Sequence, residues 1–201
     1  MTRRLVLATR NAHKVTELHA ILADSGLDVD LVGADAYPEI PDVRETGVTF
    51  AENALLKARA LAAGTGLPAV ADDSGLCVDV LGGAPGIFSA RWAGKHGDDA
   101  ANLDLLLAQL GDIDTPHRAA HFTCAAALAL PDGTTRVVEG RLRGTLRTTP
   151  AGTNGFGYDP ILQPDGSTLT CAELTPAEKN AISHRGQAFR ALTPLIAELL
   201  A

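Results

Sequence analysis

Strand and helix patterns alternate over the first 72 residues, and this alternation constrains the fold more than any other feature of the sequence. A short apolar run at residues 3–8 leads through a three-residue loop into a helical pattern at residues 12–25, which Gly26 closes. Further strand patterns cover residues 28–32 and 68–72. Strands that alternate with helices are typical of α/β proteins, in which helices cover a sheet. We therefore expect an α/β fold.

The second half of the chain predicts strands of both senses in one sheet. Strand patterns at residues 119–130 and 135–143 flank a Pro-Asp-Gly sequence at residues 131–133, which is the clearest hairpin signal. An amphipathic helical pattern precedes them at residues 98–110, and another covers the C-terminal region. Pro194 lies inside that last pattern and is expected to kink or restart the helix.

Two T-x-x-E sequences, at residues 49–52 and 175–178, have the form of helix capping boxes. In such a box the Thr side chain accepts from the amide three residues later, while the Glu side chain reaches back. The first box predicts a helix that runs to about Ala63 and ends at Gly64. The second starts the C-terminal helical region, with Pro176 in its favoured first-turn position.

Length and composition favour one globular domain without a nucleic acid partner. The chain has 201 residues, 46% apolar and 20% charged, and a net charge of −7. Binding to a nucleic acid polymer needs a basic stripe, so an acidic chain is not expected to bind one. The longest apolar stretch near the N-terminus, residues 5–8, is far shorter than the ~20 residues of a membrane span. We therefore expect a cytoplasmic protein with no membrane partner.

Neither a disulfide framework nor a zinc site is predicted. The cysteines are Cys77, Cys124 and Cys171, an odd number without CxxC spacing, and the six histidines are scattered. We interpret the cysteines as reduced, small apolar residues.

Four clusters combine charged side chains with loops or helix starts, where sites are often built: residues 9–14, 45–57, 72–75 and 156–185. In the first cluster, Thr9 to Lys14 place hydroxyl, amide and ammonium donors beside a helix N-terminus, whose free amides and dipole favour phosphate. This cluster is either a triphosphate cradle or an ordinary helix start, with Asn11 as the cap and Lys14 in solvent.

Asp72 and Asp73 follow an apolar strand and open an Asp-Asp-Ser-Gly turn at its carboxyl end, where open α/β sheets bind ligands. Two adjacent acids are costly there unless something neutralises them. Mg²⁺ would do so, because it binds one or two carboxylates and keeps waters and substrate phosphates as its other ligands. The alternative is a plain turn in which one Asp accepts from nearby amides.

The other charged residues of these clusters are ambiguous when taken singly. Lys57 lies one helical turn after Asn53, so the two share a helix face. Lys57, Lys179 and Arg185 could equally be solvated surface charges, and Phe156 could be a core residue.

Taken together, the four clusters resemble the inosine/xanthosine triphosphate pyrophosphatase family. The matching motifs run in family order from residue 5 to residue 186, which excludes coincidence as a serious explanation. They are Leu7-Ala8-Thr9-Arg10-Asn11 with Lys14, Glu45-Thr46-Gly47, Thr49-Phe50 with Glu52-Asn53-Ala54 and Lys57-Ala58, Ala71-Asp72-Asp73-Ser74-Gly75-Leu76, Gly82-Gly83-Ala84-Pro85-Gly86 with Ser89-Ala90-Arg91, Gly155-Phe156-Gly157-Tyr158-Asp159-Pro160, and Lys179 with Ile182-Ser183-His184-Arg185-Gly186.

The resemblance implies an elongated mixed β-sheet flanked by helices, in one domain of two lobes with a central nucleotide cleft, and a homodimer. It also implies Mg²⁺-dependent hydrolysis of non-canonical purine nucleoside triphosphates (ITP, dITP and XTP) to the monophosphate and pyrophosphate. Departures from the family pattern are few. Arg10 and Asn154 stand where relatives often have glycine, and Trp92 stands where tyrosine is common.

The resemblance also implies a role for each site residue. Glu45 and Asp73 would bind Mg²⁺, and Asp73 would also be the general base. The implied triphosphate ligands are Thr9, Arg10, Asn11, Ala12, His13 and Lys14, with Lys57 adding positive charge and Ser74 touching the nucleotide. The implied ligands of the base and sugar are Phe156, Gly157, Tyr158, Asp159, Lys179, His184 and Arg185.

The implied mechanism needs no covalent intermediate. Asp73 would orient or deprotonate a water that attacks the α-phosphorus, and pyrophosphate would leave as its magnesium complex. The residues leave open whether Asp72 or Asp73 is the base, how ITP, dITP and XTP rank, and where the dimer interface lies.

Two rival functions remain at this level. One is a regulatory module that binds purine nucleotides without cleaving them, although a pure binder has little reason to place acids beside phosphates. The other is a pyrophosphatase for damaged pyrimidine nucleotides, which the same phosphate-binding groups could serve. A P-loop NTPase and a dinucleotide dehydrogenase are not supported, because GxxxxGK(S/T) is absent and no GxGxxG opens a helix after a strand.

Overall fold

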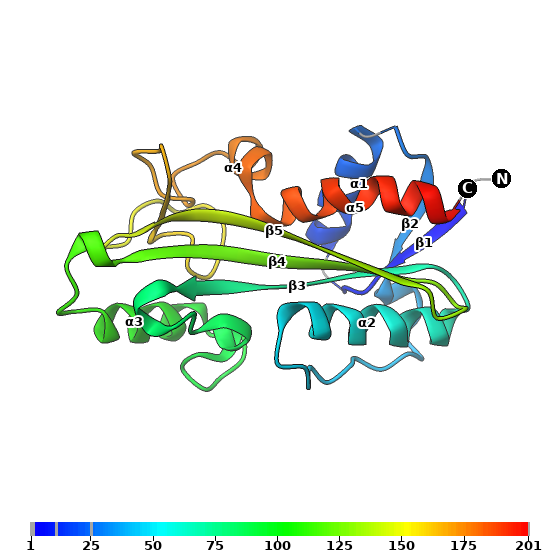
Figure 1. Cartoon of the computed structure of the whole chain (residues 1–201), viewed down its shortest axis with the longest axis horizontal. Helices are drawn as coiled ribbons and strands as arrows, with labels where there is room; N and C mark the ends of the chain where they lie inside the picture. Colours follow the sequence, from blue (N-terminus) through cyan, green and yellow to red (C-terminus); the bar gives the residue numbers. More distant parts are fainter. Residues whose placement is uncertain (1–2, 11, 25, 201) are drawn as a thin grey trace. The chain divides into compact units, whose positions relative to one another are not determined.

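A computed structural model of the chain describes residues 3–10, 12–24 and 26–200. Its centre is a six-stranded sheet with the strand order β2-β1-β3-β4-β5-β6, and helices flank the sheet (Figure 1). The strands are β1 (Arg3–Leu7), β2 (Val29–Gly33), β3 (Ala69–Val78), β4 (Ala119–Ala129), β5 (Thr135–Leu146) and β6 (Leu162–Pro164). The helices are α1 (Ala12–Asp24), α2 (Phe50–Thr65), α3 (Asp99–Gln109), α4 (Pro176–Ile182) and α5 (His184–Leu200).

The sheet is mixed, as predicted. Strand β1 pairs in parallel with β2, with Leu5 opposite Leu31, and in parallel with β3, with Leu7 opposite Val70. Strand β6 pairs antiparallel with β5. The predicted α/β fold with a mixed sheet and flanking helices is therefore confirmed, although β6, which has three residues, was not predicted.

The chain divides into two compact units. Unit 1 comprises Met1–Asp73, Cys124–Gly140 and Arg185–Ala201, and unit 2 comprises Ser74–Thr123 and Arg141–His184. The chain passes from one unit to the other within β3, β4 and β5, and again between His184 and Arg185 at the start of α5. The prediction that these parts form one domain rather than two independent ones stays a prediction.

Unit 1 has two apolar clusters, and successive residues at the start of β3 belong alternately to one and the other. Val70 packs with Leu7 of β1 and Phe189 of α5. Ala69 and Ala71 belong instead to the cluster that contains the alanines of α2. This alternation is the period of two expected for a strand, and it defines an α5 face and an α2 face at this part of β3.

Unit 2 has a core of its own. It is formed by apolar residues of β3, α3, β4 and β5, which surround Tyr158 and Ile161. Arg118 is 1% exposed at the edge of this core, where its guanidinium donates to the carbonyl oxygens of Leu110, Ile113 and Leu146. Because Tyr158 and Ile161 belong to this core, the loop that contains Tyr158 is anchored in a packed interior.

The predicted turn at residues 72–75 is wrong, because β3 continues through these residues to Val78. Their Asp, Ser and Gly composition is typical of turns, but side-chain partners elsewhere in the chain neutralise both acids and allow the extended conformation. The predicted end of α2 is also wrong by two residues. The helix ends at Thr65, and Gly66 adopts the left-handed conformation (φ 67°), whereas Gly64 packs closely on Ile40.

The predicted helix starts are largely confirmed. The Thr175 box is complete, with its reciprocal bonds to Glu178. At α2, Thr49 accepts from the amide of Glu52, but the Glu52 carboxylate accepts from the amide of Val48 (2.7 Å) rather than of Thr49. Helix α5 runs through Pro194 without a restart, since the residues around it are packed in the core of unit 1.

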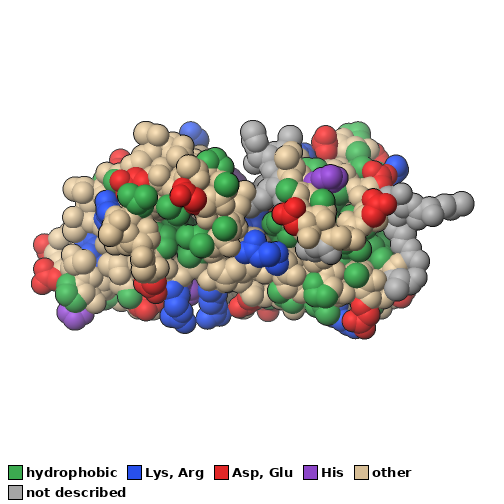
Figure 2. All heavy atoms as spheres, turned by 90° about the horizontal axis from the view of Figure 1, so that it is seen from above, with side chains coloured by type: hydrophobic (Ala, Val, Ile, Leu, Met, Phe, Trp, Pro, Cys, Tyr) green, Lys and Arg blue, Asp and Glu red, His purple; other side chains and the backbone are tan. Residues whose placement is uncertain are grey.

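Figure 2 shows acidic and basic side chains interspersed on the face that it views. In the ranges that the structure describes, no helix is both long and apolar enough to cross a membrane.

Candidate active site

Asp72 and Asp73 are directed to different partners by the alternation along β3. Asp72 follows Ala71 and lies on the α5 face, where its Oδ2 accepts from both Nε and Nη2 of Arg185 at 3.1 Å. Both partners are buried, with 5% of Asp72 and 8% of Arg185 exposed. This ion pair, in which one carboxylate oxygen accepts two hydrogen bonds, links β3 to the first turn of α5 within unit 1.

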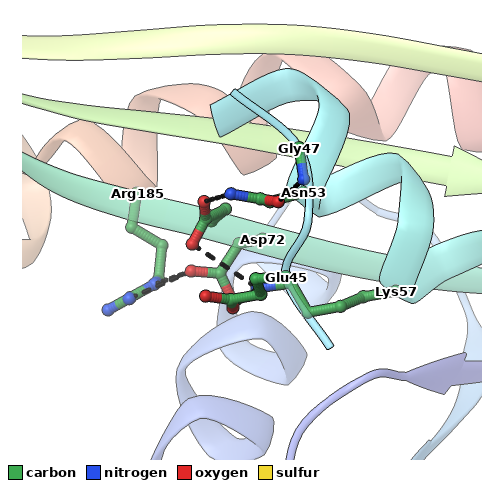
Figure 3. A network of polar contacts seen from close by, with 7 residues as sticks. Glu45, Gly47, Asn53, Lys57, Asp72 and Arg185 are labelled. Atoms are coloured by element: carbon green, nitrogen blue, oxygen red, sulfur yellow. Dashed lines mark hydrogen bonds and ion pairs between the residues drawn. The ribbon is translucent and has the colours of Figure 1, made fainter. Parts of the chain in front are cut away.

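Asp73 contacts two side chains of α2 and through them joins a network with three other polar side chains. Figure 3 labels the three others, which are Glu45, Asn53 and Lys57. The Oδ2 atom of Asp73 accepts from Nδ2 of Asn53 at 3.2 Å, and Oδ1 of the same carboxylate lies 3.5 Å from Nζ of Lys57. The same Nζ donates to Oε1 of Glu45 at 2.9 Å. Lys57 therefore contacts both acids that the sequence predicted as magnesium ligands.

Helix α2 supplies two of these side chains from one face. Asn53 and Lys57 are one turn apart, and both contact Asp73, which confirms that they share a face. Asn53 is fully buried, and its Oδ1 accepts from the amide of Gly47 at 2.8 Å. A Cβ on Gly47 would lie 2.6 Å from Cβ of Glu52, so only glycine allows this close approach. Glu45, two residues before Gly47, contacts the same helix through Lys57.

Burial and charge shift the pKa values of Asp73 and Lys57. The pKa of Asp73 is raised, first by burial and also by Glu45 and Asp72, while Lys57 and Asn53 oppose the rise. For Lys57, burial alone would lower the pKa, but Asp73, Asp72 and Glu45 together outweigh it and raise the pKa. The site thus holds a charged lysine beside a carboxylate with enhanced affinity for a proton.

The chemistry of this network fits Mg²⁺. Glu45 and Asp73 offer hard carboxylate oxygens, and both already contact a single cationic nitrogen. Mg²⁺ usually takes one or two carboxylates and completes its shell with waters and phosphate oxygens. Among the described residues, no group of three or more His, Cys, Asp or Glu could hold a metal ion.

The predicted triphosphate cradle is described only in part. The amide of Ala8 donates to the carbonyl of Val70 at 2.8 Å, which places Thr9 beside β3. The guanidinium of Arg10 donates to Asp42 (3.0 Å) and to the carbonyl of Ile40 (2.9 Å), so Arg10 secures the loop after β2. Asn11 lies outside the described residues, as do the side chains of Ala12, His13 and Lys14. Their phosphate-binding roles stay predictions.

In unit 2, three of the predicted base and sugar ligands form one cluster. Asp159 accepts from Nζ of Lys179 at 2.5 Å and from the amide of Phe156 at 2.8 Å. The Lys179 ammonium lies 5.1 Å from the centroid of the Phe156 ring, which is 62% exposed. The interpretation of Phe156 as a core residue is therefore wrong. A Cβ on Gly155 would clash with Asp159 Oδ2, so glycine is required at this turn.

The other predicted residues of unit 2 are more enclosed. Tyr158 is buried and donates to the carbonyl of Ser89 at 2.9 Å, which suits a residue that holds the loop. His184 stacks on Phe122 with ring centroids 5.0 Å apart. Ser74 follows Asp73 within β3. That these residues of unit 2 and the Asp73 network of unit 1 bind the same nucleotide stays a prediction.

Comparison with known proteins identifies the family. A model of the Ham1 family matches residues 5–195. The chain belongs to the Ham1 family. Over 98% of each chain it is 81% identical to a dITP/XTP pyrophosphatase of Streptomyces avermitilis and 59% identical to one of Frankia alni. The family predicted from the motifs is thereby confirmed.

Solved structures of Ham1-type proteins have the same fold. A HAM1 protein from Coxiella burnetii is 43% identical, with a TM-score of 0.90 over 98% of this chain and 100% of that one. A nucleoside-triphosphatase / dITP/XTP pyrophosphatase from Mycobacterium abscessus is 54% identical, with a TM-score of 0.81 over 96% and 99%.

Two features of the candidate site were missed from the sequence. Asn53 was noted as a neighbour of Lys57 but was not named as a site residue, although its helical spacing and its place in the Glu52-Asn53-Ala54 motif were the available signals. The pairing of Asp72 with Arg185 had no signal at all, because the two residues are 113 positions apart.

Replacing each of the two adjacent acids by asparagine should have a different effect on the stability of the protein. Asp72→Asn leaves the Arg185 guanidinium buried without its counter-charge, and we expect the free energy of unfolding to fall by about 3 kcal/mol. Asp73 has a raised folded pKa, so the stability that its protonated form contributes at low pH is lost as the pH rises from the unfolded pKa through the folded pKa. Asp73→Asn should therefore leave the metal-free protein as stable as, or more stable than, the wild type at pH 7.

Urea unfolding of both variants with a chelator, followed by circular dichroism, measures this difference. Equal destabilisation by the two substitutions would contradict the separation of roles between Asp72 and Asp73.

Proposed function

We propose that this chain is a Mg²⁺-dependent nucleoside triphosphate pyrophosphatase that hydrolyses ITP, dITP and XTP to the monophosphate and pyrophosphate, and so clears non-canonical purines from the nucleotide pool. The observation that carries the proposal is the network of Asp73, Glu45, Asn53 and Lys57 in a Ham1 family member. Curated relatives up to 81% identical are named dITP/XTP pyrophosphatases, which supports the substrate class.

In the proposed mechanism, Asp73 accepts the proton of the attacking water. Burial raises its pKa toward the range in which a carboxylate is an effective general base. The hydrogen bond from Asn53 fixes one oxygen of the carboxylate, and the other oxygen remains on the side of Lys57 and Glu45. The water attacks the α-phosphorus, the α,β-phosphoanhydride bond breaks, and pyrophosphate is the leaving group.

Glu45 and Asp73 would hold Mg²⁺, which when bound supplies positive charge to the phosphates and acidifies a bound water. Lys57 adds a positive charge from the protein itself, and Lys14 is proposed to add another at the triphosphate, whereas the guanidinium of Arg10 is paired with Asp42. An acidic protein has to concentrate its cations locally to bind such an anion, and Lys57 meets that need in this network.

The base and sugar are assigned to Phe156, Lys179, His184 and Arg185. The exposed ring of Phe156 offers a stacking surface for any purine. Donors on Lys179 and Arg185 suit the 6-carbonyl of hypoxanthine or xanthine and not the amino group of adenine. A homodimer and a cytoplasmic location complete the proposal, as implied by the family resemblance and by the composition.

A panel of nucleoside triphosphates, assayed with and without Mg²⁺, tests the function. We expect ITP, dITP and XTP to release pyrophosphate and the monophosphate at rates far above ATP and GTP, and only with the metal. Orthophosphate as the first product would contradict cleavage at the α-phosphorus. Binding without turnover would favour the regulatory module, and preference for modified pyrimidines would favour the second rival.

Asp73→Asn tests the assignment of the base. The substitution keeps the shape of the side chain but removes its charge and basicity, so we expect kcat to fall by ~10² or more in a protein that remains folded. Steady-state kinetics at saturating Mg²⁺ measures the effect. Near-wild-type turnover would move the chemistry to another residue.

Base discrimination by Arg185 needs a variant that does not leave Asp72 buried alone. The double variant Asp72→Asn/Arg185→Gln removes both charges of the pair and keeps polar groups of similar size. If Arg185 reads the 6-carbonyl, the kcat/KM for ITP should fall much more than that for ATP, because the loss of a buried donor affects only the base that accepts from it. Asp72→Asn alone is the control for the effect of Asp72. An unchanged ITP to ATP ratio in the double variant would leave Arg185 with a structural role.

A further inference from the structure

Lys57 occupies the position of a shared cation between two acids. Its Nζ lies 2.9 Å from Glu45 Oε1 and 3.5 Å from Asp73 Oδ1. The three side chains are largely removed from solvent, with 18% of Lys57, 28% of Glu45 and 12% of Asp73 exposed. Solvent therefore screens these contacts less than it screens surface ion pairs, and one ammonium offsets the repulsion between the two carboxylates.

The same carboxylates are the proposed ligands of Mg²⁺, so the ammonium and the metal have the same partners. A divalent ion beside a lysine at this range would be repelled strongly, since neither charge is well screened. Lys57 has a flexible four-carbon stem that lets its ammonium change position. Asp73 would keep its orientation during such a change, because Asn53 holds its other oxygen at 3.2 Å.

We propose that Lys57 is a resident counter-ion that competes with the divalent metal for Glu45 and Asp73, and whose ammonium passes to the triphosphate when the metal replaces it. The movement of the ammonium to the triphosphate rests on the proposed function. The competition with the metal concerns only the protein and the metal. The lysine then keeps the two acids together in the metal-free protein and adds its charge to the substrate only once the metal is in place.

This arrangement gives Lys57 opposite effects on two measurable quantities. Without nucleotide, the lysine weakens metal binding, because the metal has to displace it. With substrate, the lysine strengthens binding of the triphosphate. A lysine that only bound phosphate would affect substrate alone, and a lysine that only arranged the carboxylates would strengthen metal binding.

Lys57→Met tests the competition, because methionine removes the charge and keeps an unbranched chain. Mn²⁺ serves as the probe, with its binding to the nucleotide-free protein measured by calorimetry and by the loss of its free electron paramagnetic resonance signal. We expect the variant to bind Mn²⁺ about tenfold tighter or more than the wild type. Arg59→Met is the matched control. Arg59 is exposed on the same helix and loses the same charge, so this variant should bind Mn²⁺ as the wild type does.

Unchanged or weaker Mn²⁺ binding by Lys57→Met would overturn the competition. If that variant does not fold, Lys57→Gln repeats the test with a side chain that can still donate to Glu45.

The KM for ITP at saturating Mg²⁺ tests the transfer to phosphate, and we expect it to rise about tenfold in Lys57→Met but not in Arg59→Met. An unchanged KM would overturn the transfer. Failure of the wild type to release pyrophosphate would instead refute the proposed function, and the Mn²⁺ measurement would still decide the competition.

Discussion

The site depends on the alternation of side chains along β3, which gives two consecutive acids separate environments. Ala69 and Ala71 pack against α2, and Val70 packs on the α5 side. The apolar residues that anchor the strand therefore also set the directions of the acids that follow them. If Asp72 and Asp73 shared one environment, their repulsion would raise the pKa of one of them strongly. Instead, Arg185 neutralises Asp72, while Lys57 and Asn53 contact Asp73.

The sequence predicted the parts of the fold that local periodicity determines. The α/β class, the strands of both senses, the hairpin around residues 131–133 and the capped starts of α2 and α4 all follow from patterns within a few residues, and the structure contains them. The errors arose where distant contacts override local preference. Residues 72–75 have the composition of a turn, yet they extend because the rest of unit 1 supplies partners for both acids. Strand β6 has only three residues, too few for a periodic signal.

The candidate site was predictable in its residue types but not in its pairings. The family resemblance identified Glu45, Asp73 and Lys57 as site residues, whereas the acid pair and the helical lysine taken singly left plainer alternatives open. The contact of both acids with the single ammonium of Lys57 depends on the tertiary structure and could not be predicted from the motifs. Arg10 shows the same limit. Its position in the phosphate motif suggested a ligand of the substrate, whereas its guanidinium donates to the loop after β2. A motif indicates which chemical groups are present, whereas the fold determines which of their donors are already hydrogen-bonded within the protein.

The contrast between Asp72 and Asp73 also supports the proposal that Asp73, rather than Asp72, is the base. The Oδ2 of Asp72 accepts two hydrogen bonds from a guanidinium that cannot lose its proton, so this carboxylate is committed to a fixed partner. Asp73 accepts one bond from a neutral amide, and its other partner is a flexible lysine that can move away. Its position is nevertheless well defined, because β3 continues on both sides of it and the neighbouring ion pair ties that strand to α5. A base has to be held in place while its proton-accepting oxygen remains available. Asp73 meets both conditions, and Asp72 meets only the first.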